Sequence, residues 1–91
     1  MVVKQNRGRK RYILFTHGSD VSRNQINNFF NMHLKELKGK IKSKLVKYNS
    51  NNGIIRVDHK LSQDAREIMN RNGREMGIKT IRTSGTLKGL E

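Results

Sequence analysis

The sequence of 91 residues contains no Cys and carries 20 Lys and Arg against seven Asp and Glu, a formal net charge of +13. The lack of Cys excludes disulfides and thiolate-bound zinc, and no apolar run is long enough to span a bilayer. So much like charge repels itself in a compact chain unless a polyanion neutralises it, which favours nucleic acid as the partner. An anionic membrane surface is the weaker alternative, because binding there usually needs a basic amphipathic helix with large anchors, and the chain has no Trp.

The chain begins with a basic segment. Residues 4–11, KQNRGRKR, hold five cations and one Gly, a composition typical of a solvated arm that attracts phosphates. An ordinary disordered basic tail is the alternative. We therefore expect an arm over residues 1–11 and a single domain over residues 12–91. Since charged residues follow the first three positions directly, we expect no signal peptide and a cytoplasmic protein.

The first predicted strand is YILFTH, residues 12–17. Alternation places Ile13 and Phe15 on one face and Tyr12 and Leu14 on the other. A helix is expected to follow Gly18, with Ser22 as its N-cap and Gln25 completing a capping box.

The spacing of apolar residues after this cap predicts one buried helical face. That face holds Ile26, Phe29, Phe30, Leu34, Leu37 and Ile41. His33 lies beside the stripe and reads as a boundary or core histidine rather than a metal ligand.

KLVKYN (44–49) and GIIRVDH (53–59) are predicted strands joined by a hairpin. Ile55 and Val57 would face the core. The other face of this strand would carry Ile54, Arg56 and Asp58.

Ser62 is expected to cap a second helix with an inward face of Ala65, Ile68 and Met69, and IKTIRT (78–83) is a fourth strand. The resulting order, β-α-β-β-α-β, is the ferredoxin-like pattern of an α/β (α+β) sandwich. In it, two helices cover one face of a four-stranded antiparallel sheet.

Self-contained catalysis does not fit this composition. The few acids are scattered, and no predicted pairing gathers the carboxylates of a two-metal nuclease. Three His without Cys form neither a zinc site nor a nucleophile triad. We therefore expect no catalytic residue, no metal ligand and no cofactor bound by the protein itself.

Base stacking, as in RNA-recognition motifs, would need aromatic residues on the open face, where Tyr12 is the only candidate. Contacts of Lys and Arg with the phosphate backbone remain. The candidate RNA-binding residues are Arg7, Arg9, Lys10, Arg11, Arg56, Arg82, Ser84, Gly85, Thr86 and Lys88. The candidate face for a protein partner holds Tyr12, Leu14 and Ile54.

The tail TIRTSGTLKGL (80–90) combines hydroxyl groups, a Gly and two cations. If Gly85 adopts φ > 0, the amides and hydroxyls of Ser84 and Thr86 would form a concave donor site beside Arg82 and Lys88, suited to a phosphate oxygen. The alternative is a turn that only ends a strand, with hydroxyls that cap the backbone locally.

Residues 79–90, KTIRTSGTLKGL, resemble the closing signature of ribonuclease P protein component 2, a family of small archaeal and eukaryotic subunits. The match is to the hydroxyl-glycine-threonine turn at residues 84–86, followed by an aliphatic residue and Lys88. KRYILF (10–15) and NGIIRVDHKLSQDAREIM (52–69) are similar to the first strand and the strand-then-helix segment of the family. The chain departs from the family at Arg82 and Thr83, where Gly and an aliphatic residue are more usual.

The resemblance implies a protein subunit of ribonuclease P, which removes the 5′ leader from precursor tRNA. In that family the RNA subunit performs the hydrolysis, with Mg²⁺ on the RNA. The implied partners are ribonuclease P RNA, precursor tRNA, protein component 3 and the other protein subunits, and a homodimer within a heterotetramer is possible. A ribosomal or other ribonucleoprotein-assembly protein with the same fold is the alternative function.

Overall fold

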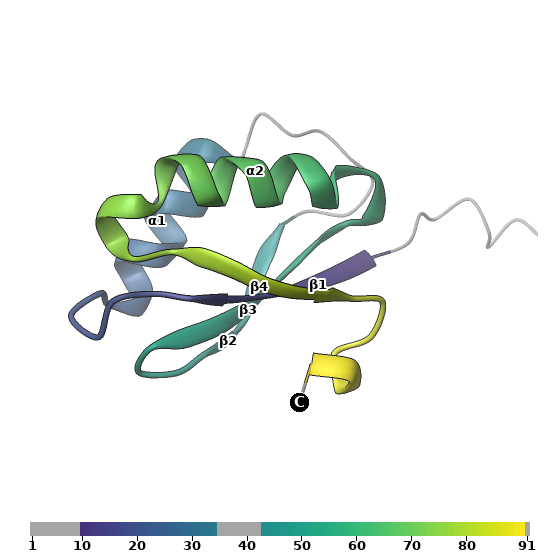
Figure 1. Cartoon of the computed structure of the whole chain (residues 1–91), viewed down its shortest axis with the longest axis horizontal. Coiled ribbons are helices and arrows are strands. Elements are labelled where there is room, and N and C mark those ends of the chain that lie inside the picture. Colours follow the sequence, from purple (N-terminus) through teal and green to yellow (C-terminus); the bar gives the residue numbers. More distant parts are fainter. Residues whose placement is uncertain (1–9, 35–42, 91) are drawn as a thin grey trace, which may run out of the picture.

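The computed structural model describes residues 10–34 and 43–90, which form a two-layer α/β sandwich (Figure 1). The main elements are β1 (Lys10–Thr16), α1 (Arg23–His33), β2 (Lys44–Tyr48), β3 (Asn52–Asp58), α2 (Ser62–Asn72) and β4 (Lys79–Ser84). The strand order is β2-β3-β1-β4, and every neighbouring pair is antiparallel. Each β-α-β unit therefore has another strand inserted between its two parallel strands, which confirms the ferredoxin-like prediction.

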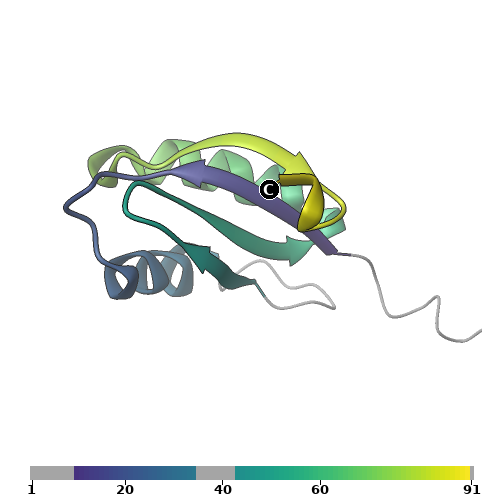
Figure 2. The same ribbon diagram turned by 90° about the horizontal axis from the view of Figure 1, so that it is seen from below.

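Both helices cover one face of the sheet (Figure 1). We call the opposite side the open face. Of the described elements, only the short 3₁₀ turn η4 (Lys88–Leu90) lies on that side, near the end of β4 (Figure 2). Within residues 10–34 and 43–90, neither α-helix covers the open face.

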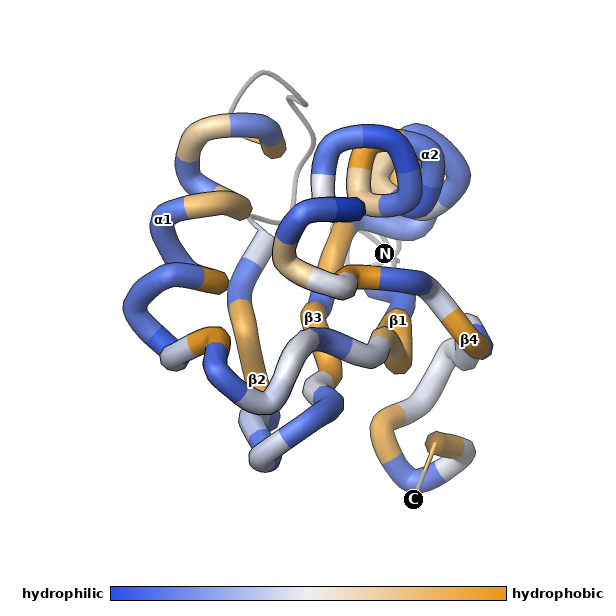
Figure 3. The backbone as a smooth tube through the Cα atoms, turned by 60° about the vertical axis from the view of Figure 1, so that its left-hand side comes forward, coloured by the Kyte–Doolittle hydropathy of each residue, from blue (hydrophilic) through white to orange (hydrophobic). Residues whose placement is uncertain are grey.

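The core lies between the sheet and the helices, and Figure 3 shows hydrophobic positions along both the strands and the helices. The inward alternation predicted for β1 and β3 is confirmed, because Ile13, Phe15, Ile55 and Val57 are all buried. Their partners in the hydrophobic cluster include Ile26, Phe29, Phe30, Leu34, Leu45, Ala65, Met69 and Ile78. Burial of these side chains is the main favourable term in the folding of so small a domain.

The predicted capping box of α1 is present. The Gln25 amide donates to the Ser22 hydroxyl at 3.2 Å, and the Ser22 amide donates to the Gln25 side chain at 2.7 Å. Two of the unpaired N–H groups at the start of the helix are thereby satisfied. The helical face that we expected to continue through Leu37 and Ile41 lies outside the described residues.

The predicted cap of α2 is wrong. Ser62 is the first residue of the helix, and its hydroxyl donates to the carbonyl of His59 at 3.0 Å. The N-cap position of α2 is Leu61, which makes no side-chain hydrogen bond. The nearby side-chain cap is that of Asp58, which accepts from the Lys60 amide at 3.0 Å and starts the 3₁₀ turn η2 (His59–Leu61). Since this turn leads directly into α2, the capping function lies one turn earlier than the helix itself.

His17, only 4% exposed, fixes the β2–β3 hairpin to the end of β1. One ring nitrogen lies 2.8 Å from the Gly18 carbonyl oxygen, and the other lies 2.9 Å from that of Asn49 and 3.2 Å from that of Asn52. The ring also stacks on Tyr48, with centroids 5.1 Å apart. His17 therefore contacts three backbone carbonyls and links the end of β1 to the β2–β3 hairpin, which explains a buried imidazole without invoking a metal.

The glycine that needs its conformational freedom is Gly77, not Gly85. Gly77 follows the 3₁₀ turn η3 (Arg74–Met76) with φ of 72°, and it is the only described residue with positive φ. Gly85 does not adopt the positive φ that the donor-site interpretation of the tail would use. A Cβ at Gly77 would approach the Gly18 backbone nitrogen to 2.9 Å, whereas a Cβ at Gly85 would meet only the end of the flexible Arg11 side chain.

Substitution of these two glycines should therefore have different effects. Gly77→Ala should lower the free energy of unfolding by about 1–2 kcal/mol, because a left-handed conformation is costly for a residue with Cβ. Gly85→Ala should change it by about 0.5 kcal/mol or less. Urea denaturation of both variants measures the difference, and equal losses would contradict this assignment.

Candidate nucleic-acid interface

The register of the sheet gathers cations from all four strands on the open face. Residues directly opposite each other in neighbouring strands share a face. One row across the sheet runs Lys44, Arg56, Tyr12, Ser84, and the next runs Lys47, Ile54, Leu14, Arg82. Each row is thus a line of paired positions on the same side of the sheet.

Irregularities in the two outer strands increase this charge. In β2 the register shifts between Leu45 and Lys47, so Lys44 and Lys47 both lie opposite open-face residues of β3. Without the extra residue, strict alternation would send two lysines three positions apart to opposite faces.

β4 contains a register shift of the same kind. Leu14 is opposite Arg82, while Phe15, the next residue of β1, is opposite Thr80, so Ile81 is the extra residue. Lys79 then lies opposite Thr16 and shares the open face with Arg82. Ile81 is left 58% exposed.

The apolar centre of the open face offers less surface than expected. Register brings Leu14 next to Ile54, as predicted for a protein-binding face. Ile54, however, is only 2% exposed, while Tyr12 and Leu14 are half-buried. Ile54 therefore has almost no surface left for a partner, and the protein-binding role of this group stays a prediction.

Lys10 of β1 lies on the open face opposite Asp58, whereas Lys44, Arg56 and Arg82 have no acidic residue opposite them. None of these four cations forms an ion pair with another residue that the structure describes. Arg56 also has a buried Nε without a hydrogen-bond partner. A polyanion on this face would therefore gain electrostatic attraction without first breaking ion pairs among these side chains.

In the turn after β4, the hydroxyl groups of Ser84 and Thr86 cap the backbone locally, which was the alternative to a phosphate site. The Ser84 hydroxyl accepts from the Thr86 amide at 3.2 Å, and the Thr86 hydroxyl accepts from the Gly89 amide at 3.2 Å. Both amides are thereby used inside the turn. A phosphate contact here remains a prediction, for which the hydroxyl protons and the exposed Lys88 are among the available groups.

Arg11 belongs to this turn rather than to the arm. β1 begins at Lys10, two residues earlier than expected, so Lys10 and Arg11 are part of the sheet. The Arg11 guanidinium lies beside Gly85, where Nη1 would be 2.7 Å from an added Cβ. Sequence alone did not reveal this contact, because it joins residues at opposite ends of the chain. The predicted RNA-binding residues Arg7 and Arg9 lie outside the described residues.

Two further kinds of feature, a metal site and a membrane span, can be checked in the described ranges. Within residues 10–34 and 43–90, no group of three His, Asp or Glu side chains is placed to hold a metal ion. Within the same ranges, no helix has the length and apolarity that a membrane span requires.

Comparison with known proteins adds no relative. No protein-family model matches the sequence, and no curated protein matches it significantly. The resemblance to ribonuclease P component 2 therefore rests on the tail signature and on the two similar segments.

Removal of two open-face charges should weaken the salt dependence of RNA binding. For single-stranded RNA each lost phosphate contact flattens the slope of log K against log salt by about 0.7. Arg56→Gln with Arg82→Gln should therefore flatten it by about 1.4 if each side chain contacts one phosphate.

Arg23→Gln with Lys60→Gln is the matched control, since it removes the same charge from exposed sites at the start of α1 and in η2. Fluorescence anisotropy with a labelled oligonucleotide at several salt concentrations measures both slopes. Equal flattening in the two double variants would mean that only net charge matters.

Proposed function

We propose that this chain binds RNA through the open face of its sheet and acts as a non-catalytic protein subunit of ribonuclease P, equivalent to component 2. The observation that carries the RNA-binding part is the register, which aligns cations from all four strands on one face. RNA is the polyanion that suits such a face, because its phosphates can contact cations spread over several strands.

The apolar part of the same face favours RNA over a purely protein partner. A protein interface normally has an apolar centre from which charged residues are depleted. Here the aliphatic centre is mostly covered, and the cations Lys44, Arg56 and Arg82 lie close around it. Tyr12, flanked by Arg56 and Ser84 in the register, is the one aromatic residue of the two rows and can offer its ring to an unpaired base.

The assignment to ribonuclease P rests on the tail. The residues that carry the resemblance, Ser84 to Lys88, continue directly from β4, and η4 lies on the side of the open face (Figure 1). The end of the tail signature and the cationic rows thus lie on the same side of the sheet, as one RNA-binding surface would require. Ribonuclease P RNA, precursor tRNA and protein component 3 are the proposed partners, in the cytoplasm. In this proposal the hydrolytic step and its Mg²⁺ belong to the RNA subunit.

A reconstituted cleavage assay tests this proposal. Precursor tRNA is incubated with the ribonuclease P RNA and component 3 of the same organism, with or without this chain. We expect no cleavage by the chain alone and a severalfold higher rate when it joins the other two. Arg82→Gln with Lys88→Gln should reduce that gain severalfold, whereas the Arg23→Gln, Lys60→Gln control should not.

Three results of this assay would contradict the proposal. Specific 5′ cleavage by the chain after rigorous removal of RNA would end the non-catalytic interpretation. A rate that does not respond to the chain, while it still binds RNA, would favour the alternative of a ribosomal or other ribonucleoprotein-assembly protein. A tail variant as active as the control would remove the tail from the RNA-binding surface.

A further inference from the structure

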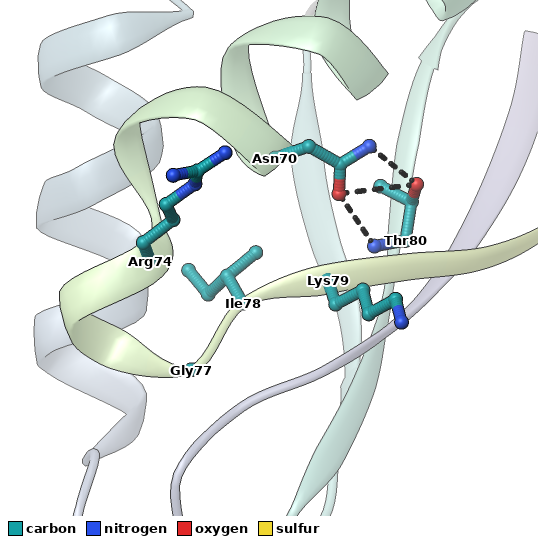
Figure 4. A pocket seen from close by; sticks show the side chains of 6 residues that line it. All are labelled: Asn70, Arg74, Gly77, Ile78, Lys79 and Thr80. Atoms are coloured by element: carbon teal, nitrogen blue, oxygen red, sulfur yellow. Dashed lines mark hydrogen bonds between the residues drawn. The ribbon is translucent and has the colours of Figure 1, made fainter.

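A groove runs along the outer edge of β4, beside the C-terminal half of α2 (Figure 4). It consists of two adjoining hollows of about 420 and 380 Å³. Asn70 and Arg74 line both hollows, so the two lie side by side. The remaining lining residues are Glu67, Arg71, Gly77, Ile78, Lys79 and Thr80.

The protein itself satisfies the edge of β4 that borders the groove. The Thr80 amide donates to Asn70 Oδ1 at 2.9 Å, and the Asn70 side-chain amide donates to the Thr80 hydroxyl at 3.0 Å (Figure 4). A strand added at this edge would need the Thr80 N–H, which already donates to Asn70. The hydrogen bonds between Asn70 and Thr80 therefore protect the edge from strand pairing. The occupant of the groove is therefore not expected to be a β-strand.

The charge of the groove indicates an anion. Three cations, Arg71, Arg74 and Lys79, line the two hollows, and the only carboxylate among the lining residues is that of Glu67. None of the three forms an ion pair with another residue in the described ranges. In Figure 4, Arg74 and Lys79 flank Ile78, which is 3% exposed and lies in the wall between them. Arginine side chains suit phosphate in particular, because the guanidinium can donate two parallel hydrogen bonds to its oxygens.

Lys79 connects the groove with the open face. It lines the groove, and its register position opposite Thr16 is on the same side as Arg82. The register irregularity at Ile81 creates this continuity, because it turns Thr80 toward α2 and Lys79 toward the open face. The phosphate backbone of an RNA strand that contacts Arg82 could thus continue past Lys79 and reach Arg74 around the edge of the sheet.

We propose that this groove is a phosphate-binding site, occupied by a phosphodiester segment of the same RNA that lies on the open face. The RNA part rests on the proposed function, whereas the affinity for phosphate does not. The bound RNA would then contact two sides of β4, which would fix its direction across the sheet.

The test uses Arg71→Gln with Arg74→Gln, both exposed positions, and the Arg23→Gln, Lys60→Gln control of equal charge. In the first arm, ¹⁵N-labelled protein is titrated with inorganic pyrophosphate. We expect amide signals of residues 77–80 and the Asn70 side chain to shift in the wild type and the control. In the groove variant the affinity should fall about tenfold or more, as for the loss of two charge-assisted hydrogen bonds.

In the second arm, the salt slope of RNA binding is measured. The groove variant should flatten it by about 1.4, the value for two single-strand phosphate contacts. Pyrophosphate shifts that are absent, or that persist in the groove variant, would overturn the phosphate site. Localised shifts with an unchanged RNA slope would overturn the RNA part and leave a free phosphate compound as the ligand.

The two proposals can fail separately. If the Arg56, Arg82 variant keeps the wild-type RNA slope while the groove variant flattens it, the open face is overturned as the RNA surface and the groove stands. If the reverse is found, the groove is overturned and the open face stands.

Discussion

The register between β1 and β3 is the constraint on which the rest of the structure depends. These central strands pair Ile13 with Ile55 on the helix side and Tyr12 with Arg56 on the open side. A slip of one residue would expose the first pair and bury an arginine, because side chains alternate faces along a strand. Burial of an unpaired charge and loss of two core side chains together would exceed the small stability of such a domain. The same register that builds the core therefore also fixes the cationic face.

The outer strands turn this fixed centre into a wider cationic surface. Each contains one extra residue, Val46 in β2 and Ile81 in β4, and each extra residue brings two cations three positions apart to the same side. Regular strands would divide these cations between the open face and the helix side, where they would interfere with the core. In β4 the irregularity also turns Thr80 toward Asn70, so one local feature adds cations to the open face, protects the edge and opens the groove. The proposed RNA surface and the proposed phosphate site are thus two consequences of the same irregular edge strand.

The sequence predicted the features that depend on local patterns. Alternation identified the inward residues of β1 and β3, the capping box located the start of α1, and the order of elements predicted the sandwich. It failed where the structure depends on contacts between distant segments. Ser62 has the sequence context of a helix N-cap, yet the side chain that caps is Asp58, at the start of η2. No local sequence pattern predicted that 3₁₀ turn. The register irregularities were equally hidden, because strict alternation is the only pattern that a short strand displays.

The candidate site divides in the same way. Alternation placed Arg56 on the open face, and the register agrees. Lys44, Lys47 and Lys79 could not be placed in this way, since their positions depend on an extra residue in each strand. The contact of Arg11 with Gly85, and the groove between α2 and β4, join segments that only the folded chain brings together. Gly85 attracted attention as a glycine in a turn, whereas the backbone requires one at Gly77.

The central claim, that RNA lies on the open face, can be tested with the two tyrosines of the chain. Tyr12 is on the open face, and Tyr48 is stacked on His17 with its hydroxyl bonded to the Val21 carbonyl at 2.6 Å. In protein with ¹³C-labelled tyrosine, addition of a single-stranded RNA oligonucleotide should shift the ring signals of Tyr12 and leave those of Tyr48 in place. Saturated RNA binding with an unchanged Tyr12, or with a shift at Tyr48 alone, would contradict the account.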